Sequence, residues 1–152
     1  MKNKIIILLG TVLLILRCSY PQTAQKQPVD YVNPYMGNIS HLLVPTYPTV
    51  SLPNSLMRVY PKRDDYISNL LSGLPLIVTS HRGTSAFDLS PFQGDEAGIK
   101  PVIEYSYDLE NIRPYFYSVY LDEQGTEVNF APSHQSAVYE FKFAQSKPQY
   151  LI

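Results

Sequence analysis

Residues 31–61, YVNPYMGNISHLLVPTYPTVSLPNSLMRVYP, form the stretch on which our interpretation of the fold depends. Five prolines lie within it, at Pro34, Pro45, Pro48, Pro53 and Pro61. Each proline fixes φ and removes a backbone donor, so the stretch cannot form a long helix. Large aromatic rings and a histidine accompany the prolines, namely Tyr31, Tyr35, His41, Tyr47 and Tyr60. A rigid, aromatic, hydrogen-bonding loop suits a flat polyhydroxylated ligand, although an irregular lid over a β-core would have the same composition.

Downstream of this stretch, apolar and polar side chains alternate along four segments. The apolar sets are Ile103, Tyr105 and Tyr107; Tyr115, Tyr117, Val119 and Leu121; Val128 and Phe130; and Ala137, Tyr139, Phe141 and Phe143. Period-two alternation repeated at this spacing predicts antiparallel strands. Residues 122–125 separate two of the sets and offer Gly125 for a tight turn. The sequence therefore predicts an all-β chain.

The segment between the two regions gives weaker patterns. Residues 56–60 and 74–79 predict two further strands, because each is a short apolar run. Asp64 or Asp65 could cap a helical turn that extends through Leu71 and ends at Gly73. Residues 80–101 contain three glycines and two prolines and predict a long loop.

Length and composition narrow the class of protein. The chain has 152 residues, which favours one domain, and a net charge of -1, which argues against nucleic acid as a partner. Hydrophobic residues make up 45% of the chain, enough for a packed core. Tyr and Pro occur 13 times each, a combination that suits an extracellular β-domain with many turns.

The N-terminus has the pattern of a targeting segment. Lys2 and Lys4 precede an apolar run, residues 5–16, that is short for a membrane span and typical of a signal peptide. We therefore expect residues 1–18 to direct export, with an uncleaved N-terminal anchor as the alternative. Residues 19–28 are polar and predict a tether.

Cys18 is the sole cysteine, so the chain has no intramolecular disulfide. It follows Leu16-Arg17, close to the position of the lipidated cysteine in a lipoprotein signal, although Arg17 is larger than the usual residue there. We expect either an outer-membrane lipoprotein anchored at Cys18 or a soluble periplasmic protein. Any membrane attachment would be through the signal or the lipid.

Two blocks of residues resemble one known family. Val32-Asn33-Pro34-Tyr35-Met36-Gly37, followed by His41 and Tyr47-Pro48, resembles the opening of glycoside hydrolase family 92, the calcium-dependent α-mannosidases. Thr79-Ser80-His81-Arg82-Gly83-Thr84-Ser85 is similar to a second block of that family. The resemblance covers roughly residues 29–152.

The resemblance implies an architecture. Residues 29–152 would form part of an N-terminal antiparallel β-sandwich of the galactose-mutarotase-like supersandwich type. The catalytic α/α barrel of the family would be missing from this chain, which we expect to be truncated. The last strands would then lack partners and leave an open edge with exposed apolar faces.

The resemblance also implies substrate contacts at five positions. Tyr35 and Tyr47 would stack on the sugar or wall its pocket, while His41, His81 and Arg82 would donate to its hydroxyls. The alternative for the two histidines is that they hold loop backbone by hydrogen bonds.

No catalytic or metal-binding residue is predicted in this chain. Most acidic residues, Glu110 among them, occupy turns or exposed strand positions, and the family's acid, base and calcium ligands belong to its second domain. The three histidines lack zinc-site spacing, and no nucleophile elbow surrounds Ser80 or Ser85.

The first functional hypothesis is the N-terminal carbohydrate-binding or structural domain of an exported α-mannosidase. The full-length protein would hydrolyse terminal α-mannosides with inversion and would use calcium. Its partners would be mannose-containing glycans and the missing catalytic domain. The alternatives are a stand-alone exported carbohydrate-binding lipoprotein and a non-functional gene fragment.

Overall fold

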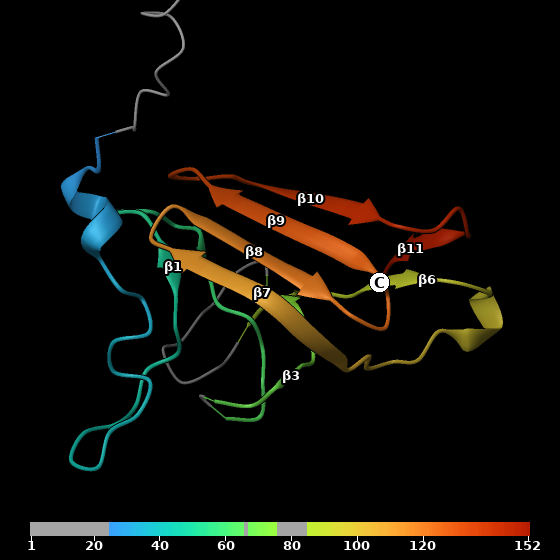
Figure 1. The fold of residues 1–152 in the computed structure, drawn as a ribbon, viewed down its shortest axis with the longest axis horizontal. Coiled ribbons are helices and arrows are strands. Elements are labelled where there is room, and N and C mark those ends of the chain that lie inside the picture. Colours follow the sequence, from blue (N-terminus) through green and yellow to red (C-terminus); the bar gives the residue numbers. More distant parts are fainter. Residues whose placement is uncertain (1–24, 66, 76–84) are drawn as a thin grey trace, which may run out of the picture.

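The computed structural model describes residues 25–65, 67–75 and 85–152 and is built around one five-stranded antiparallel sheet (Figure 1). The sheet has the order β10-β9-β8-β7-β3. Its strands are β7 (Tyr105–Arg113), β8 (Phe116–Leu121), β9 (Thr126–Pro132), β10 (Ala137–Phe143) and the short β3 (Leu70–Leu71). β7 to β10 follow one another in sequence and in space, so tight turns suffice to connect them. One such turn ends at Gly125, whose φ of +53° is accessible to glycine.

Three two-stranded antiparallel ladders and two 3-10 helices complete the described residues. The ladders are β1 (Val50–Ser51) with β2 (Arg58–Val59), β4 (Leu74–Pro75) with β5 (Asp88–Leu89), and β6 (Pro91–Gln93) with β11 (Gln149–Leu151). The helices are η1 (Pro28–Tyr31) and η2 (Glu96–Gly98). Side chains from the first two ladders meet one face of the five-stranded sheet, which gives the two layers of a sandwich.

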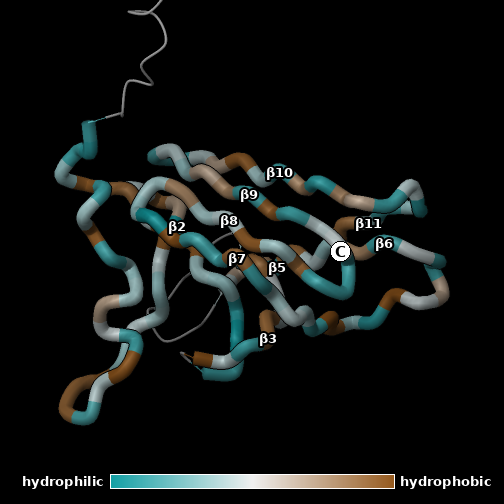
Figure 2. Tube along the Cα trace, in the orientation of Figure 1, coloured by the Kyte–Doolittle hydropathy of each residue, from teal (hydrophilic) through white to brown (hydrophobic). Residues whose placement is uncertain are grey.

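The alternation along the strands explains the core. Tyr117, Val119 and Leu121 of β8 are at most 1% exposed, and Val128 and Phe130 of β9 are fully buried. The facing layer supplies Val50, Val59 and Leu74, and Leu71 joins the core from β3 at the edge of the sheet. Burial of each such side chain contributes about 1.5–3 kcal/mol to folding. The predicted all-β antiparallel sandwich is therefore confirmed, and Figure 2 shows apolar and polar positions alternating along its strands.

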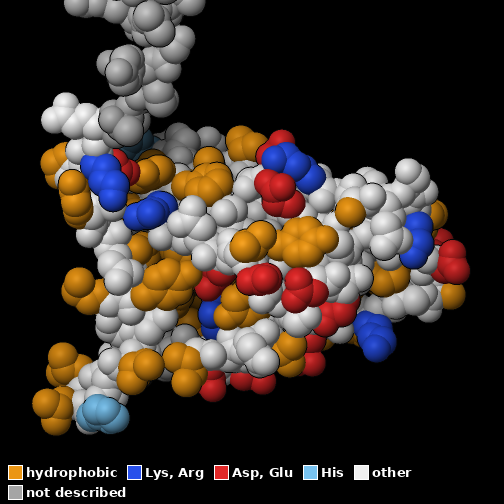
Figure 3. All heavy atoms as spheres, viewed as in Figure 1, with side chains coloured by type: hydrophobic (Ala, Val, Ile, Leu, Met, Phe, Trp, Pro, Cys, Tyr) orange, Lys and Arg blue, Asp and Glu red, His pale blue; other side chains and the backbone are white. Residues whose placement is uncertain are grey.

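The opposite face of the sheet carries charges. Lys142 lies 3.0 Å from Glu127 and 3.2 Å from Glu140, and Asn129 donates to both carboxylates. These groups are exposed, so each pair contributes little to stability. Figure 3 shows charged side chains gathered over this face, which marks it as the solvent side.

Three sequence-based expectations for residues 56–101 need correction. The helical turn expected between Asp64 and Gly73 is absent from the described part of that segment, where Leu70–Leu71 pair with Tyr105–Ser106 as β3. Leu71 packs in the core, and tertiary burial has decided its conformation against the local capping signal. The expected loop 80–101 contains β5, β6 and η2 in its described part, and the strand expected at 56–60 covers only Arg58–Val59.

The expectation that the last strands lack partners is also wrong in part. β11 pairs with β6, and Ile152 exchanges backbone hydrogen bonds with Ser90. The apolar face of β8 is fully covered, whereas that of β10 is half-buried. Within the described residues β10 pairs on one side only, with β9, and so remains an edge strand.

Several expectations concern residues outside the described ranges. These are the signal segment 1–18 with Cys18, most of the tether 19–28, the end of the strand expected at 74–79, and the second family-like block with His81 and Arg82. The helix η1 begins at Pro28, where the expected tether ends. In the part of the chain that the structure describes, no helix has the length and apolar character needed to cross a membrane.

Candidate functional site

The family-like block at residues 32–37 folds into two consecutive turns. Asn33 Oδ1 accepts a hydrogen bond from the Tyr35 backbone N–H at 3.0 Å, and Met36 N–H donates to the Asn33 carbonyl. Such a turn follows from an Asn-Pro pair, because the Asn side chain caps the backbone and Pro fixes φ. Gly37 ends the second turn at φ +91°, and a Cβ there would lie 3.0 Å from Thr46 Oγ1. The order Asn-Pro-Tyr-x-Gly therefore presents Tyr35 in a defined orientation.

Residues 38–45 project from the body as an apolar loop (Figure 1). A hydrogen bond from Thr46 N–H to the Gly37 carbonyl closes its neck, and Leu43 N–H donates to Ser40 Oγ near its tip. His41 lies exposed between Ser40 and Leu43. The loop therefore carries His41 away from the cavity that residues 30–35 and 110–113 line.

A bulge in β7 decides where Glu110 points. Asp108 pairs with Tyr120 and Asn111 with Ser118, so two residues of β7 stand opposite Val119 alone. The extra residue is Leu109, which has φ +53° and is 76% exposed. Before the bulge, the odd-numbered residues Tyr105 and Tyr107 face inward. After the bulge the even-numbered residues face inward, so Glu110 lies on the same face as the two tyrosines.

Glu110 forms a buried ion pair with Arg63. Arg63 Nη2 lies 2.5 Å from Glu110 Oε1, and the two side chains are 3% and 9% exposed. Arg63 Nη1 also donates to Tyr107 Oη at 2.9 Å, and the guanidinium lies 5.2 Å from the Tyr107 ring centre. Desolvation of two charges is costly, so this pair needs the additional hydrogen bonds that surround it.

Three tyrosines connect the ion pair to the predicted site. Tyr35 Oη donates to Glu110 Oε2 at 3.0 Å, and Tyr117 Oη donates to Glu110 Oε1 at 3.4 Å. Tyr47 Oη donates to the Arg63 carbonyl at 3.4 Å, while its ring stacks on Tyr60 with centroids 4.6 Å apart. One face of the Tyr47 ring is thus covered by Tyr60.

A cavity of about 240 Å³ lies beside these groups. Its lining comes from residues 30–35 on one side and residues 110–113 on the other. Arg113 Nη1 donates to the Asp30 carbonyl, and Tyr115 Oη donates to Asp30 Oδ1, so the two walls are held together. The cavity is therefore polar, with the Tyr31 and Tyr35 rings at its wall.

The ionisation of these groups follows from their surroundings. Burial, and then the charge and hydrogen bond of Glu110, raise the pKa of the Tyr35 phenol. Burial raises the pKa of Tyr117 well above its usual value. The Tyr115 hydrogen bond and the Gln27 backbone N–H lower the pKa of the Asp30 carboxyl. Near neutral pH both phenols are protonated donors.

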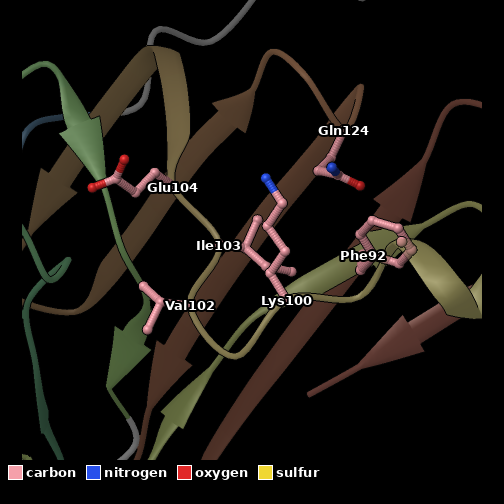
Figure 4. Close-up of a pocket in the computed structure, with 7 residues that line it drawn as sticks. Phe92, Lys100, Val102, Ile103, Glu104 and Gln124 are labelled. Carbon is pink, nitrogen blue, oxygen red and sulfur yellow. The ribbon is translucent and has the colours of Figure 1, made fainter.

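A second hollow, of about 540 Å³, lies at the far end of the sheet beside β6 and η2. Figure 4 shows Lys100 extending toward Gln124, with the Phe92 ring beyond them and Glu104 turned away. Tyr35, His41 and Tyr47 do not line it. The polar groups in this hollow converge less than those around Glu110, so the cavity beside Tyr35 is the stronger candidate.

Of the five predicted contact residues, Tyr35 lines the cavity beside Glu110, and Tyr47 lies outside its lining. Tyr35 and Tyr47 are linked through Arg63 and Glu110, whereas His41 lies apart and His81 and Arg82 are outside the described residues. Sequence analysis missed Arg63 and assigned Glu110 to solvated surface, which is wrong. The available signal was the change of apolar parity in β7, from 105 and 107 to 112, which indicates a bulge.

Calcium is implied by the family resemblance, but the described residues do not fit it. Among residues 25–65, 67–75 and 85–152, no three His, Cys, Asp or Glu side chains come together as a ligand set. Glu110 has Arg63 as its counter-ion, and Asp30 is occupied by Tyr115 and Gln27. No chemical step through calcium is therefore derived for this site.

Comparison with known proteins gives two matches. The model of the glycosyl hydrolase family 92 N-terminal domain matches residues 31–152. Among solved structures, the chain is similar to the family GH92 inverting mannosidase BT2199 from Bacteroides thetaiotaomicron VPI-5482, with 26% identity and a TM-score of 0.65. That similarity covers 84% of this chain and 20% of the mannosidase, so the chain spans about one fifth of its length. No curated protein matches the chain.

Proposed function

The chain belongs to glycoside hydrolase family 92 through the family's N-terminal domain, and on that premise we propose that it is the sugar-contacting, non-catalytic part of an exported α-mannosidase. The catalytic carboxylates and calcium ligands would belong to a separate catalytic domain. This chain would bind and orient a terminal α-mannoside for that domain. Residues 1–18 would direct export to the periplasm, and Cys18 would carry a lipid anchor in the outer membrane.

The observation that carries this proposal is the cavity beside Tyr35. Its volume of about 240 Å³ lies below the ~300–1,000 Å³ of pockets for drug-sized ligands and suits one sugar unit. Side chains at its wall offer hydroxyl, amide, guanidinium and carboxylate groups, which match the donors and acceptors of a sugar. The rings of Tyr31 and Tyr35 offer apolar faces to the C–H surface of a pyranose.

The apolar loop supports the proposed partner, a catalytic domain. Its side chains are exposed to an unusual degree: Ile39 68%, Leu42 95%, Leu43 79% and Val44 62%. A contiguous apolar surface of this kind is typical of an interaction site. Figures 2 and 3 show it at the same end of the molecule as η1. The loop would pack on the catalytic domain, and His41 would donate to a sugar hydroxyl at that contact rather than in the cavity beside Tyr35, with His81 and Arg82 as further donors.

Binding of a mannoside tests the proposal. The full chain is titrated with methyl α-mannoside, and the ¹H–¹⁵N spectrum is followed, with methyl α-galactoside as the comparison ligand. We expect saturable shifts at residues 30–35 and 110–113 for the mannoside alone. Tyr35→Ala should weaken binding at least tenfold, since its ring walls the cavity, whereas His134→Ala in the exposed β9–β10 turn should have no effect.

Hydrolysis of an aryl α-mannoside is measured on the same preparation with and without calcium. No release is expected, because no acid–base carboxylate pair is assigned to this chain. Calcium-dependent release by this chain, with contaminating enzyme excluded, would contradict the division of roles. Absence of mannoside binding by the folded chain would contradict the sugar-contacting role.

A further inference from the structure

The Arg63–Glu110 pair is a costly arrangement for a small domain. Both charges are almost fully removed from water, and such a pair is often no better for stability than apolar side chains of similar volume. A role in specificity or orientation accounts for such a pair better than stability does. The hydrogen bonds around the pair indicate which residue is oriented.

The backbone at this point is also strained. Leu109 adopts a left-handed φ of +53°, which is unfavourable for a residue other than glycine, and its side chain is left 76% exposed. The bulge it forms turns the Glu110 carboxylate inward. Strain that re-aims one side chain beside a cavity is a feature of binding sites.

Tyr35 is held at both ends. Its backbone N–H donates to Asn33 Oδ1 at 3.0 Å, and its hydroxyl donates to Glu110 Oε2 at 3.0 Å. The ring between these two anchors is 37% exposed and lines the cavity. A ring fixed before binding loses less rotamer freedom when the ligand arrives, which increases affinity.

We propose that Glu110, fixed by Arg63, is a positioning residue that holds the Tyr35 ring in one orientation at the wall of the cavity. Glu110 acts through Tyr35, so its effect on sugar binding rests on the proposed function. The orientation of the Tyr35 ring itself does not depend on the proposed function. An experiment can therefore contradict the positioning role of Glu110 without contradicting the proposed function, and the reverse.

Two variants remove the contact from opposite ends. Tyr35→Phe keeps the ring and removes the hydroxyl. In Glu110→Gln the amide oxygen stays on Arg63 and the NH₂ group faces the Tyr35 hydroxyl, which loses its charged acceptor and can only accept a weaker hydrogen bond from the neutral amide. Tyr105→Phe is the matched control, because it removes a buried hydroxyl that donates to the Pro91 carbonyl at 2.9 Å, away from the cavity.

Affinity for methyl α-mannoside is the first measurement. We expect Tyr35→Phe and Glu110→Gln each to weaken binding about tenfold, as for loss of a hydrogen bond to a charged group. Tyr105→Phe should bind as the parent does, although its urea midpoint falls. The double variant should be no weaker than either single one, because both changes remove the same contact.

The ring signals of Tyr35 are the second measurement, and they do not depend on the sugar. In a chain with ¹³C-labelled tyrosine, the signal lost in Tyr35→Phe identifies this ring. Glu110→Gln should shift and average that signal, while leaving the Tyr105 signal in place. A purely structural role for Glu110 would lower stability without this selective change.

The two measurements distinguish failure of the positioning role from failure of the proposed function. Unchanged affinity together with an unchanged Tyr35 signal in Glu110→Gln would overturn the positioning role. If the parent chain binds no mannoside, the proposed function fails, and the Tyr35 signal alone decides the positioning role. If Glu110→Gln does not fold, Tyr35→Phe decides it, with parent-like affinity counting against the proposal.

Discussion

At the scale of the residue, Leu109 shows how one backbone angle shapes the site. A Cβ at positive φ crowds the neighbouring carbonyl, so glycine suits this position better than any other residue. Since the Leu109 side chain is 76% exposed, its removal costs little burial. We expect Leu109→Gly to be more stable than Leu109→Ala by about 1 kcal/mol in urea unfolding.

Val138 provides the control for this comparison. It is 68% exposed on β10 and shows no positive φ, so there the order should reverse, with Ala more stable than Gly. Equal stability of the two Leu109 variants would argue against a left-handed conformation at the bulge.

At the scale of the element, the loop of residues 38–45 separates surface chemistry from fold stability. Leu42 and Leu43 are almost fully exposed, and the neck of the loop is closed by backbone rather than by its side chains. Leu42→Ser/Leu43→Ser should therefore change the free energy of unfolding by less than about 0.5 kcal/mol. The same variant should reduce binding of a hydrophobic dye and self-association, because it removes an apolar patch.

Val138→Ser is the matched variant for the loop. It removes one exposed apolar side chain from β10, outside the loop. Dye binding should remain near the parent level in this variant. An equal loss of dye binding in Val138→Ser and in the loop variant would place the dye-binding apolar surface outside the loop.

At the scale of the whole molecule, buried tyrosines link stability to high pH. Burial raises the pKa of Tyr105 to about 12 from its usual value of 10.0, and the pKa values of Tyr35, Tyr107, Tyr117 and Tyr139 are raised as well. Between these pH values the unfolded chain releases the Tyr105 proton while the folded chain retains it. The free energy of unfolding should therefore be intact below pH 10 and fall as pH rises, by about 1.4 kcal/mol per unit for one such group.

Urea unfolding at pH 9, 10, 11 and 12 checks this expectation. Tyr105→Phe should lower stability at pH 9 and show a shallower decline above pH 10, since one linked proton is gone. Tyr31→Phe, at a ring that is 72% exposed, should follow the parent curve. A parent stability that stays constant to pH 12 would contradict the linkage.

The core strands were predictable because their information is local. Tyr117, Val119 and Leu121 share one side of a period-two pattern, and a sheet with one buried face accepts no other register. Gly125 marked its turn for the same reason. Leu71 was mispredicted because a short capping signal competed with burial against Tyr105, a contact between residues distant in sequence.

The sequence by itself determined the all-β class, the meander from β7 to β10, and the family through the residues around Asn33 and Tyr35. Only the tertiary structure decided the environment of Tyr35. The Arg63–Glu110 pair joins residues 47 positions apart. The bulge that turns Glu110 inward is not indicated by any single residue type. An isolated carboxylate in a strand has the chemistry of a surface group, and it becomes a buried anchor only when packing removes its water and supplies Arg63 and two phenols.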